Sequence, residues 1–259
     1  MPMKNIILAL LFTFSIKIAL ADCGMSDMFF YPETTEISLN SIFIIEGYDF
    51  SQKTINSFKD RKIYLESEKG ELVELNLQEI LKGDMRLTQA LFFPASELKP
   101  NTTYTLKYSE QTEGELREMI QYNQGQKKGV KVFWRTKDKK NNEPLSIDLK
   151  LEYEKTEVIN YGCGPSVNLI FSSNNKSKIN IWYKTEVIDL KTKAKTVYYI
   201  KENNGKLSVG HSMCSGAFTY TNKGDYSVRF TPMNMSGKTL KTTSWKTLKS
   251  PLLSTRRPF

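Results

Sequence analysis

The most informative motif of this chain is Leu98-Lys99-Pro100-Asn101-Thr102-Thr103-Tyr104. The pattern L-x-P-x-T-x-Y, followed by alternating residues, is typical of the tyrosine corner of a β-sandwich. We expect Tyr104 to open a strand and its hydroxyl to hydrogen-bond a backbone group a few residues upstream, with Leu98, Pro100 and Thr102 completing the corner. Sandwiches carry many unrelated functions, so no reaction or ligand follows from this pattern.

The sequence on both sides of this corner alternates as strands do. Residues Glu36–Glu46 predict an opening strand that is bent midway. Residues Lys62–Glu68 and Leu72–Leu77 predict a hairpin with its turn at Gly70. The segment Val130–Thr136 then closes the sheet.

About 20 residues separate the tyrosine-corner strand from this closing strand, where sandwich hairpins normally use 2 to 5. Three apolar residues in this connection have helical spacing: Leu116, Met119 and Ile120. We therefore expect a helical insert near residues 112–124. It is either a short helix that caps the open end of the sandwich or a contact surface, for which Arg117 and Tyr122 are the first candidates.

The first half resembles the bacterial Ig-like domain of S-layer and other exported cell-envelope proteins. The resemblance covers residues 32–136 and rests on these positions in order: Pro32, Ile37, Leu39, Asn40, Ser41, Phe92, Pro94, Leu98, Pro100, Thr102, Tyr104 and the closing F-W-R-T of 133–136. It implies an immunoglobulin-like or fibronectin-III-like sandwich that acts at the cell envelope, usually without catalysis. The long insert before the last strand departs from the family pattern.

The polar segment Lys137–Pro144 predicts a linker to a second domain. Residues Leu145–Tyr153 alternate strictly, and Gly224–Phe230 resembles a second tyrosine-corner strand with Tyr226 as the corner residue. The expected fold class is therefore all-β, with two tandem immunoglobulin/fibronectin-III-like β-sandwich domains at 22–140 and 141–259.

Residues 1–21 are typical of a secretory signal peptide, with Lys4 before an apolar run and Ala19-Leu20-Ala21 at the cleavage site. We expect an exported protein, periplasmic, at the cell surface or secreted, with no transmembrane segment after cleavage. The net charge of +9 is concentrated in a basic C-terminal tail from Ser236 to Phe259, which carries six cations and no acid. An exported chain rarely meets nucleic acid, so we expect no nucleic-acid partner; a solvated last strand or adsorption to an anionic envelope polymer explains the tail.

The three cysteines are Cys23, Cys163 and Cys214. Two cysteines of an exported chain are expected to pair, and Cys163 with Cys214 is the simplest choice because both lie in the second half. Cys23 is then free, intermolecular or lipidated. A single histidine and the absence of a C-x-x-C motif predict no metal site and no cofactor.

Few residues suggest chemistry. His211 lies close to Cys214, but a bridged sulfur cannot act as a nucleophile. Trp182 and Tyr198, with their aromatic neighbours Tyr183 and Tyr199, form either an aromatic platform for a sugar ring or part of a core.

We expect an exported, non-catalytic binding or adhesion module whose partner is an unknown protein or an envelope polysaccharide. The alternatives are a structural spacer of the envelope and a β-sandwich hydrolase built from scattered carboxylates. The sequence predicts neither the ligand nor the oligomeric state.

Overall fold

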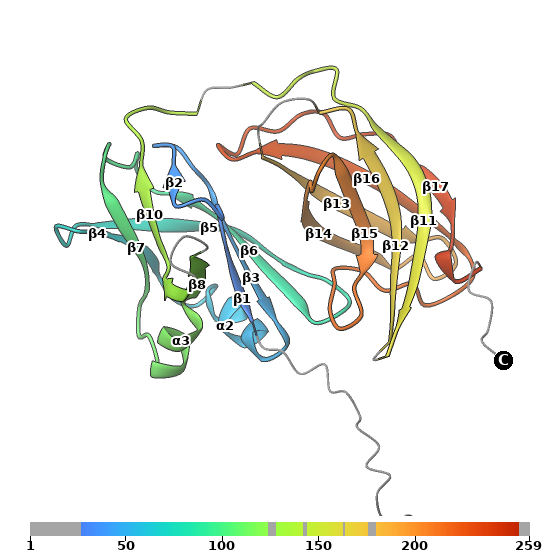
Figure 1. Cartoon of the computed structure of the whole chain (residues 1–259), viewed down its shortest axis with the longest axis horizontal. Helices are drawn as coiled ribbons and strands as arrows, with labels where there is room; N and C mark the ends of the chain where they lie inside the picture. Colours follow the sequence, from blue (N-terminus) through green and yellow to red (C-terminus); the bar gives the residue numbers. More distant parts are fainter. Residues whose placement is uncertain (1–26, 124–127, 142–143, 163, 176–179, 254–259) are drawn as a thin grey trace, which may run out of the picture.

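The computed structural model describes residues 27–123, 128–141, 144–162, 164–175 and 180–253. These residues form an all-β protein in which two sandwiches lie side by side; the first ends with β10 (Phe133–Thr136) and the second begins with β11 (Leu151–Tyr161) (Figure 1). Within these ranges no helix is long and apolar enough to cross a membrane.

The first sandwich is built on one eight-stranded sheet with the order β1-β3-β6-β5-β4-β7-β10-β2. Its strands are β1 (Met28–Tyr31), β2 (Glu36–Ile37), β3 (Phe43–Tyr48), β4 (Ile63–Ser67), β5 (Leu72–Lys82), β6 (Leu87–Pro94), β7 (Thr103–Tyr108) and β10 (Phe133–Thr136). Strand β5 pairs with β4 through Leu72–Leu75 and with β6 through Leu75–Lys82, so it joins the two layers. The hairpin predicted around Gly70 is present, with Gly70 at a φ of 79°.

The predicted bent opening strand is two separate strands. Ser38 and Ser41 form a turn, in which the Ser41 amide donates to the Ser38 carbonyl at 3.2 Å. Before the turn β2 pairs in parallel with β10, and after it β3 pairs with β1 and β6. The chain therefore passes from the layer that contains β10 to the layer that contains β1 and β6, at a point where the sequence predicts only a bend.

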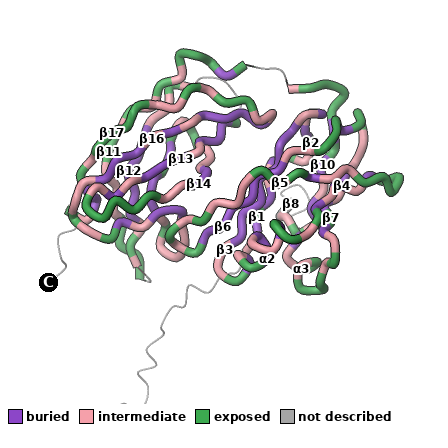
Figure 2. The backbone as a smooth tube through the Cα atoms, turned by 180° about the vertical axis from the view of Figure 1, so that it is seen from behind, coloured by how far each residue is buried: buried purple, intermediate pink, exposed green. Residues whose placement is uncertain are grey.

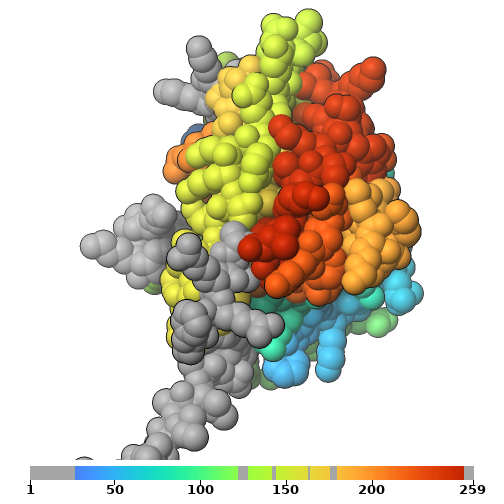
Figure 3. All heavy atoms as spheres, turned by 90° about the vertical axis from the view of Figure 1, so that its right-hand side faces the viewer, coloured from blue at the N-terminus to red at the C-terminus, as the bar shows by residue number. Residues whose placement is uncertain are grey.

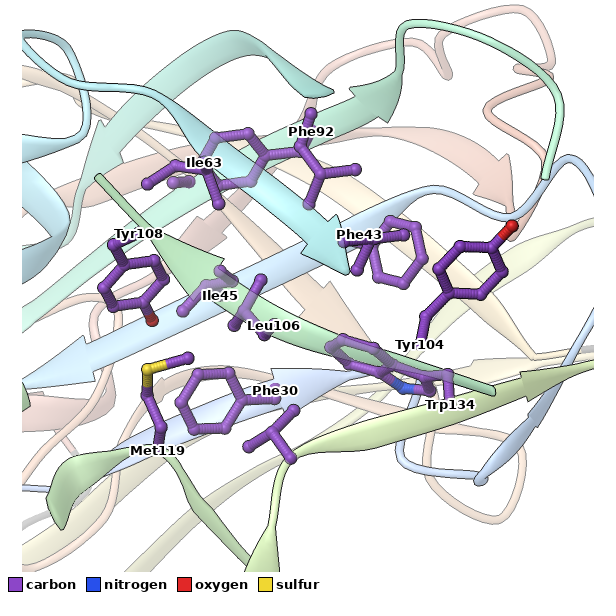
Figure 4. Packing of buried hydrophobic residues seen from close by; sticks show 14 of the residues in the cluster. Phe30, Phe43, Ile45, Ile63, Phe92, Tyr104, Leu106, Tyr108, Met119 and Trp134 are labelled. Carbon is purple, nitrogen blue, oxygen red and sulfur yellow. The ribbon is translucent and has the colours of Figure 1, made fainter. Parts of the chain in front are cut away.

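The core of the first sandwich is rich in aromatic rings (Figure 4). Trp134 and Phe43 meet edge to face with 4.8 Å between ring centroids, and the Trp134 indole N–H donates to the Pro32 carbonyl at 2.8 Å. The Tyr104 hydroxyl accepts a hydrogen bond from the Lys99 amide at 3.0 Å, which is the contact that the tyrosine corner predicts.

The insert contains less helix than its apolar spacing predicts. Helix α3 (Glu113–Glu118) begins with a capping box between Thr112 and Glu115, and it is followed by a hairpin of β8 (Ile120–Asn123) and β9 (Lys128–Lys131). Met119 is buried in the core of the first sandwich, whereas Leu116 and Ile120 are about half exposed. The three apolar side chains do not share a helical face because the helix ends before Met119. The short 3₁₀ helix η1 (Asp49–Ser51) and helix α2 (Gln52–Ser57) cover another part of this sandwich.

The second sandwich has two sheets, β11-β12-β15 and β14-β13-β16-β17. Their strands are β11 (Leu151–Tyr161), β12 (Gly164–Ser173), β13 (Ile181–Asp189), β14 (Lys195–Lys201), β15 (Lys206–His211), β16 (Asp225–Asn234) and β17 (Lys246–Lys249). The 3₁₀ helix η2 (Pro251–Leu253) ends the described chain, and Figure 3 shows this C-terminal segment beside β11 on the outer surface.

Strand β11 begins at Leu151, later than the alternation from Leu145 predicts. Leu145 itself is buried, so the start of the predicted strand packs against the core without joining a sheet. The Tyr226 hydroxyl accepts hydrogen bonds from the amides of Thr221 at 3.1 Å and Asn222 at 3.2 Å. Both sandwiches therefore contain a tyrosine corner in which the hydroxyl accepts a hydrogen bond from the amide five residues upstream.

Candidate functional site

The two sandwiches pack directly against each other. A cluster of buried apolar side chains lies between them, and we call it the joint cluster: Ile42, Ile44, Leu91, Trp182, Tyr199, Met233 and Met235. Backbone hydrogen bonds cross the same boundary, from the Ile42 amide to the Met235 carbonyl at 2.8 Å and from the Gly216 amide to the Met85 carbonyl at 3.1 Å. Buried stretches of β13, β14, β3 and β6 accordingly face the middle of the molecule in Figure 2.

The alternation of side chains along β3 explains which residues reach this boundary. Phe43 and Ile45 point into the core of the first sandwich, so Ile42, Ile44 and Glu46 point to the opposite face. Because the second sandwich covers that face, the residue that continues the apolar row is buried although it is a glutamate. Glu46 is 6% exposed.

The Glu46 carboxyl group is held by three donors. The Gln89 amide nitrogen donates to Oε1 at 2.6 Å, and the hydroxyls of Tyr31 and Tyr48 donate to Oε2 at 3.3 and 3.4 Å. Burial raises the pKa of Glu46 to about 7, and these hydrogen bonds keep the pKa from rising further. None of the described cations forms an ion pair with it.

Gln89 connects this carboxyl group to the second sandwich. Its amide nitrogen also donates to the Tyr199 carbonyl at 2.8 Å, and its amide oxygen accepts from the Tyr199 backbone N–H at 2.7 Å. Gln89 thus pairs with strand β14 through both of its amide atoms, in the way that a neighbouring strand would. This pairing fixes Glu46 relative to both halves of the molecule.

Glu46 lines a cleft of about 390 Å³ between the sandwiches. Tyr31, Tyr48 and Leu87 line it from the first sandwich, and the second contributes Trp182 and several polar residues, among them Asn168, Lys201, Lys206, Ser208 and His211. Tyr31 meets Trp182 edge to face with 4.7 Å between ring centroids. Of the described residues that line the cleft, Glu46 alone carries a carboxyl group.

The lysines of the cleft already have acidic partners. Lys201 pairs with Glu33, and its ammonium group lies over the Tyr31 ring, 6.0 Å from the centroid. Lys206 pairs with Glu154 at 3.0 Å. His211 contacts the Ser212 carbonyl through Nδ1 at 2.7 Å.

Trp182 and Tyr198 do not form an exposed contact surface. Trp182 is 2% exposed and belongs to the joint cluster, while Tyr198 is fully buried in the core of the second sandwich. The two side chains lie on opposite faces of their sheet because they sit at positions of opposite parity in the paired strands β13 and β14. Of the predicted aromatic platform, Trp182 and Tyr199 line the cleft.

The other predicted contact residues lie on the insert, apart from the cleft. Arg117 is exposed on α3, where it forms an i,i+4 ion pair with Glu113 at 3.7 Å. Tyr122 belongs to β8, and its side chain is outside the described part of the structure. Figure 1 shows α3 at the lower end of the first sandwich, away from the second sandwich.

Two predictions concern residues outside the described ranges. Cys163 is one of these residues, so its pairing with Cys214 stays a prediction. The leader 1–21 stays a prediction for the same reason. Among the described residues no group of three or more His, Cys, Asp or Glu side chains is arranged to hold a metal ion.

The sequence analysis does not single out Glu46 and Gln89, although the sequence contains a signal for the burial of Glu46. The run Ile42-Phe43-Ile44-Ile45 is apolar on both faces, which predicts a strand covered on both sides. A glutamate that continues such a run is a candidate for burial, and buried carboxyl groups are enriched at functional sites.

No known protein family matches this chain. No curated protein matches it either. Among solved structures, the chain is similar to the pullulanase from Anoxybacillus sp. LM18-11 complexed with maltotriose, at 9% identity and a TM-score of 0.26, over 86% of this chain and 25% of the pullulanase. The chain therefore spans about a quarter of the length of that enzyme.

Two further solved structures are similar at the same level. A cytokine receptor complex matches at 10% identity and a TM-score of 0.25, over 87% of this chain and 97% of the receptor chain. The adhesin InvE of Yersinia pseudotuberculosis matches at 11% identity and a TM-score of 0.22, over 88% of this chain and 59% of the adhesin. TM-scores this low carry no argument about the function of this chain.

Proposed function

We propose that this protein is an exported, non-catalytic binding module of the cell envelope and that its ligand site is the cleft between the two sandwiches. The observation that supports this most directly is the cleft itself, which combines aromatic walls with a buried carboxyl group. Ligand sites occur preferentially at domain interfaces and combine apolar walls with a few placed polar groups. The predicted leader supports export, and the Ig-like resemblance supports an envelope location.

The joint supports binding because it makes the cleft rigid. The joint cluster and the Gln89 pairing with Tyr199 hold the two walls at a fixed separation. A preformed site spends less of its binding free energy on ordering side chains and domains than a flexible site does. A purely structural spacer would need the rigid joint but not the carboxyl group in the cleft.

The hydrolase alternative has one feature in its favour. A carboxyl group with a pKa of about 7 is suited to general acid or base work near neutral pH. Glycoside hydrolysis, however, uses two carboxyl groups about 5 to 10 Å apart. Within the described lining Glu46 has no carboxyl partner, which favours binding over hydrolysis.

The proposal is tested by filling the cleft. Ser208 is exposed on β15 and lines the cleft, so Ser208→Trp places a bulky ring in it. Ser96→Trp is the matched control, because Ser96 is exposed in the loop after β6 and does not line the cleft. The immobilised full chain is incubated with envelope polysaccharide and protein fractions, and the retained material is quantified.

We expect the wild type and Ser96→Trp to retain the same component and Ser208→Trp to lose it. Equal retention by both tryptophan variants would place the ligand elsewhere and overturn the proposal. Release of new reducing ends or peptide fragments by the wild type, abolished in Glu46→Gln, would instead establish a hydrolase.

A further inference from the structure

The chemistry of the cleft indicates the charge of its ligand. Glu46 is its sole described carboxyl group, and the three groups that contact its oxygens are neutral: the Gln89 amide and the hydroxyls of Tyr31 and Tyr48. A buried carboxylate without a cation is costly, because the surrounding protein replaces water poorly. The cost falls when a cation from a ligand reaches it.

The lysines that line the cleft do not neutralise the Glu46 carboxylate. Lys201 pairs with Glu33, and Lys206 pairs with Glu154. Each lysine therefore has its own acidic partner on the rim. The charge left to be matched inside the cleft is that of Glu46.

The walls beside Glu46 are aromatic. The hydroxyls of Tyr31 and Tyr48 both donate to Oε2, so both phenol groups contact the carboxyl group, and Trp182 packs against the Tyr31 ring. Aromatic rings attract cations within about 6 Å of their centroids. Lys201 already lies at 6.0 Å from the Tyr31 centroid, which shows that a cation can approach this ring.

We propose that the cleft binds a small organic ammonium ion, with Glu46 as its counter-ion and the rings of Tyr31 and Tyr48 as its walls. This inference rests on the proposed function, because it names the ligand class of the same cleft. Quaternary ammonium groups suit such a site best, since they interact with aromatic faces and need no hydrogen-bond acceptor.

Binding is then coupled to the protonation of Glu46. The titratable groups that face it are Tyr31 from β1, Tyr48 from its own strand and Glu33 after β1, while the opposite wall contains Tyr199, Lys201, Lys206 and His211. Burial raises the pKa of both tyrosines, so they stay neutral in the range of interest. A bound cation favours the carboxylate, and binding near pH 7 releases a proton from Glu46.

The test compares choline with 3,3-dimethylbutan-1-ol, its uncharged analogue of the same shape, by titration calorimetry on the full chain. We expect choline to bind at least tenfold more tightly than the alcohol. Its affinity should fall about tenfold from pH 8 to pH 6 as Glu46 is protonated. At pH 7, titrations in buffers of different ionisation enthalpy should show net proton release.

Two test variants, Glu46→Gln and Lys201→Met, and one control variant, Glu74→Gln, locate the site. Glu46→Gln should abolish the preference for choline over the alcohol, and Glu74→Gln should not, because Glu74 is on β5 outside the cleft. Lys201→Met removes a competing cation from the Tyr31 ring and should tighten choline binding. This second variant keeps the proposal testable even where Glu46→Gln disturbs folding.

Equal binding of choline and the alcohol, or choline affinity independent of both pH and Glu46, would overturn the ammonium proposal. If neither compound binds while Ser208→Trp still abolishes retention of the envelope ligand, the ammonium proposal fails and the proposed function stands. If Ser208→Trp retains that ligand and choline does not bind, both fail.

Discussion

The joint cluster and the cleft lie side by side between the same two sandwiches, and they differ in what they bury. The joint cluster is apolar, with Ile44 and Leu91 of the first sandwich against Trp182 and Met233 of the second. The cleft buries Glu46, two residues further along β3 than Ile44. The same interface therefore buries apolar side chains in one part and a carboxyl group in the next. The apolar part of the interface fixes the position of the part that contains the carboxyl group.

We expect the largest loss of stability when the packing of the joint cluster is disrupted. Trp182→Ala removes the largest side chain of the joint cluster and should lower the free energy of unfolding by about 3 to 5 kcal/mol. Calorimetry should then resolve two transitions in place of one, because the sandwiches lose their coupling. Trp245→Ala is the control, since Trp245 is 38% exposed and should cost about 1 kcal/mol or less. A single transition unchanged in Trp182→Ala would contradict the role of the joint cluster.

The second largest loss of stability is expected at Gln89, which connects Glu46 in the cleft to Tyr199 of the joint cluster. Gln89→Ala leaves the backbone N–H and carbonyl of Tyr199 and one oxygen of Glu46 without their partner at a buried site. We expect a loss of about 2 to 4 kcal/mol, measured by urea unfolding. Gln78→Ala, at an exposed position of β5, should change stability by less than about 0.5 kcal/mol. Similar losses in both variants would argue against the Gln89 link.

The third prediction concerns the effect of Glu46 on how the free energy of unfolding depends on pH. Its pKa in the folded protein is about 7, above the value of about 4.3 for an exposed glutamate, so the folded state binds the proton more tightly. Its contribution to stability is therefore greatest at low pH and falls as the pH rises through 7.

Glu46→Gln removes this dependence, because the neutral amide does not lose a proton. We expect the variant to gain on the order of 1 to 3 kcal/mol relative to wild type between pH 5 and pH 8. Urea unfolding at four pH values across this interval measures the difference. Parallel pH profiles for the two proteins would show that Glu46 is not the group that titrates.

We expect the smallest loss of stability from substitutions at the two tyrosine corners, which lie outside the interface. Tyr104→Phe and Tyr226→Phe each remove one corner hydroxyl, which accepts backbone hydrogen bonds inside its own sandwich. Each should cost about 1 kcal/mol without altering ligand binding in the cleft. A change in cleft affinity in either variant would show that the corners and the interface are coupled.

Sequence reasoning succeeds where local pattern and fold agree. The corners at Tyr104 and Tyr226 are predictable because the hydrogen bond joins residues only four or five positions apart. The hairpin at Gly70 follows from a local turn in the same way. The insert is predicted less well, because the core, rather than helical spacing, decides where Met119 points.

Trp182 shows why the candidate site could not be predicted in the same way. Its sequence context fits an exposed aromatic platform as well as a core, and only the position of the other sandwich decides between them. Gln89 pairs with Tyr199 over 110 positions of sequence, and no local pattern specifies that distance.

An all-β chain with two tyrosine corners can be predicted from the sequence, because strand alternation and corner hydrogen bonds are local. The burial of Ile44 in the joint cluster and the position of Glu46 in a cleft, on the same face of the same strand, follow only from the way the two sandwiches pack. The reason is that burial of an outward-facing residue depends on what another sandwich places over it, and that contact joins segments far apart in the chain.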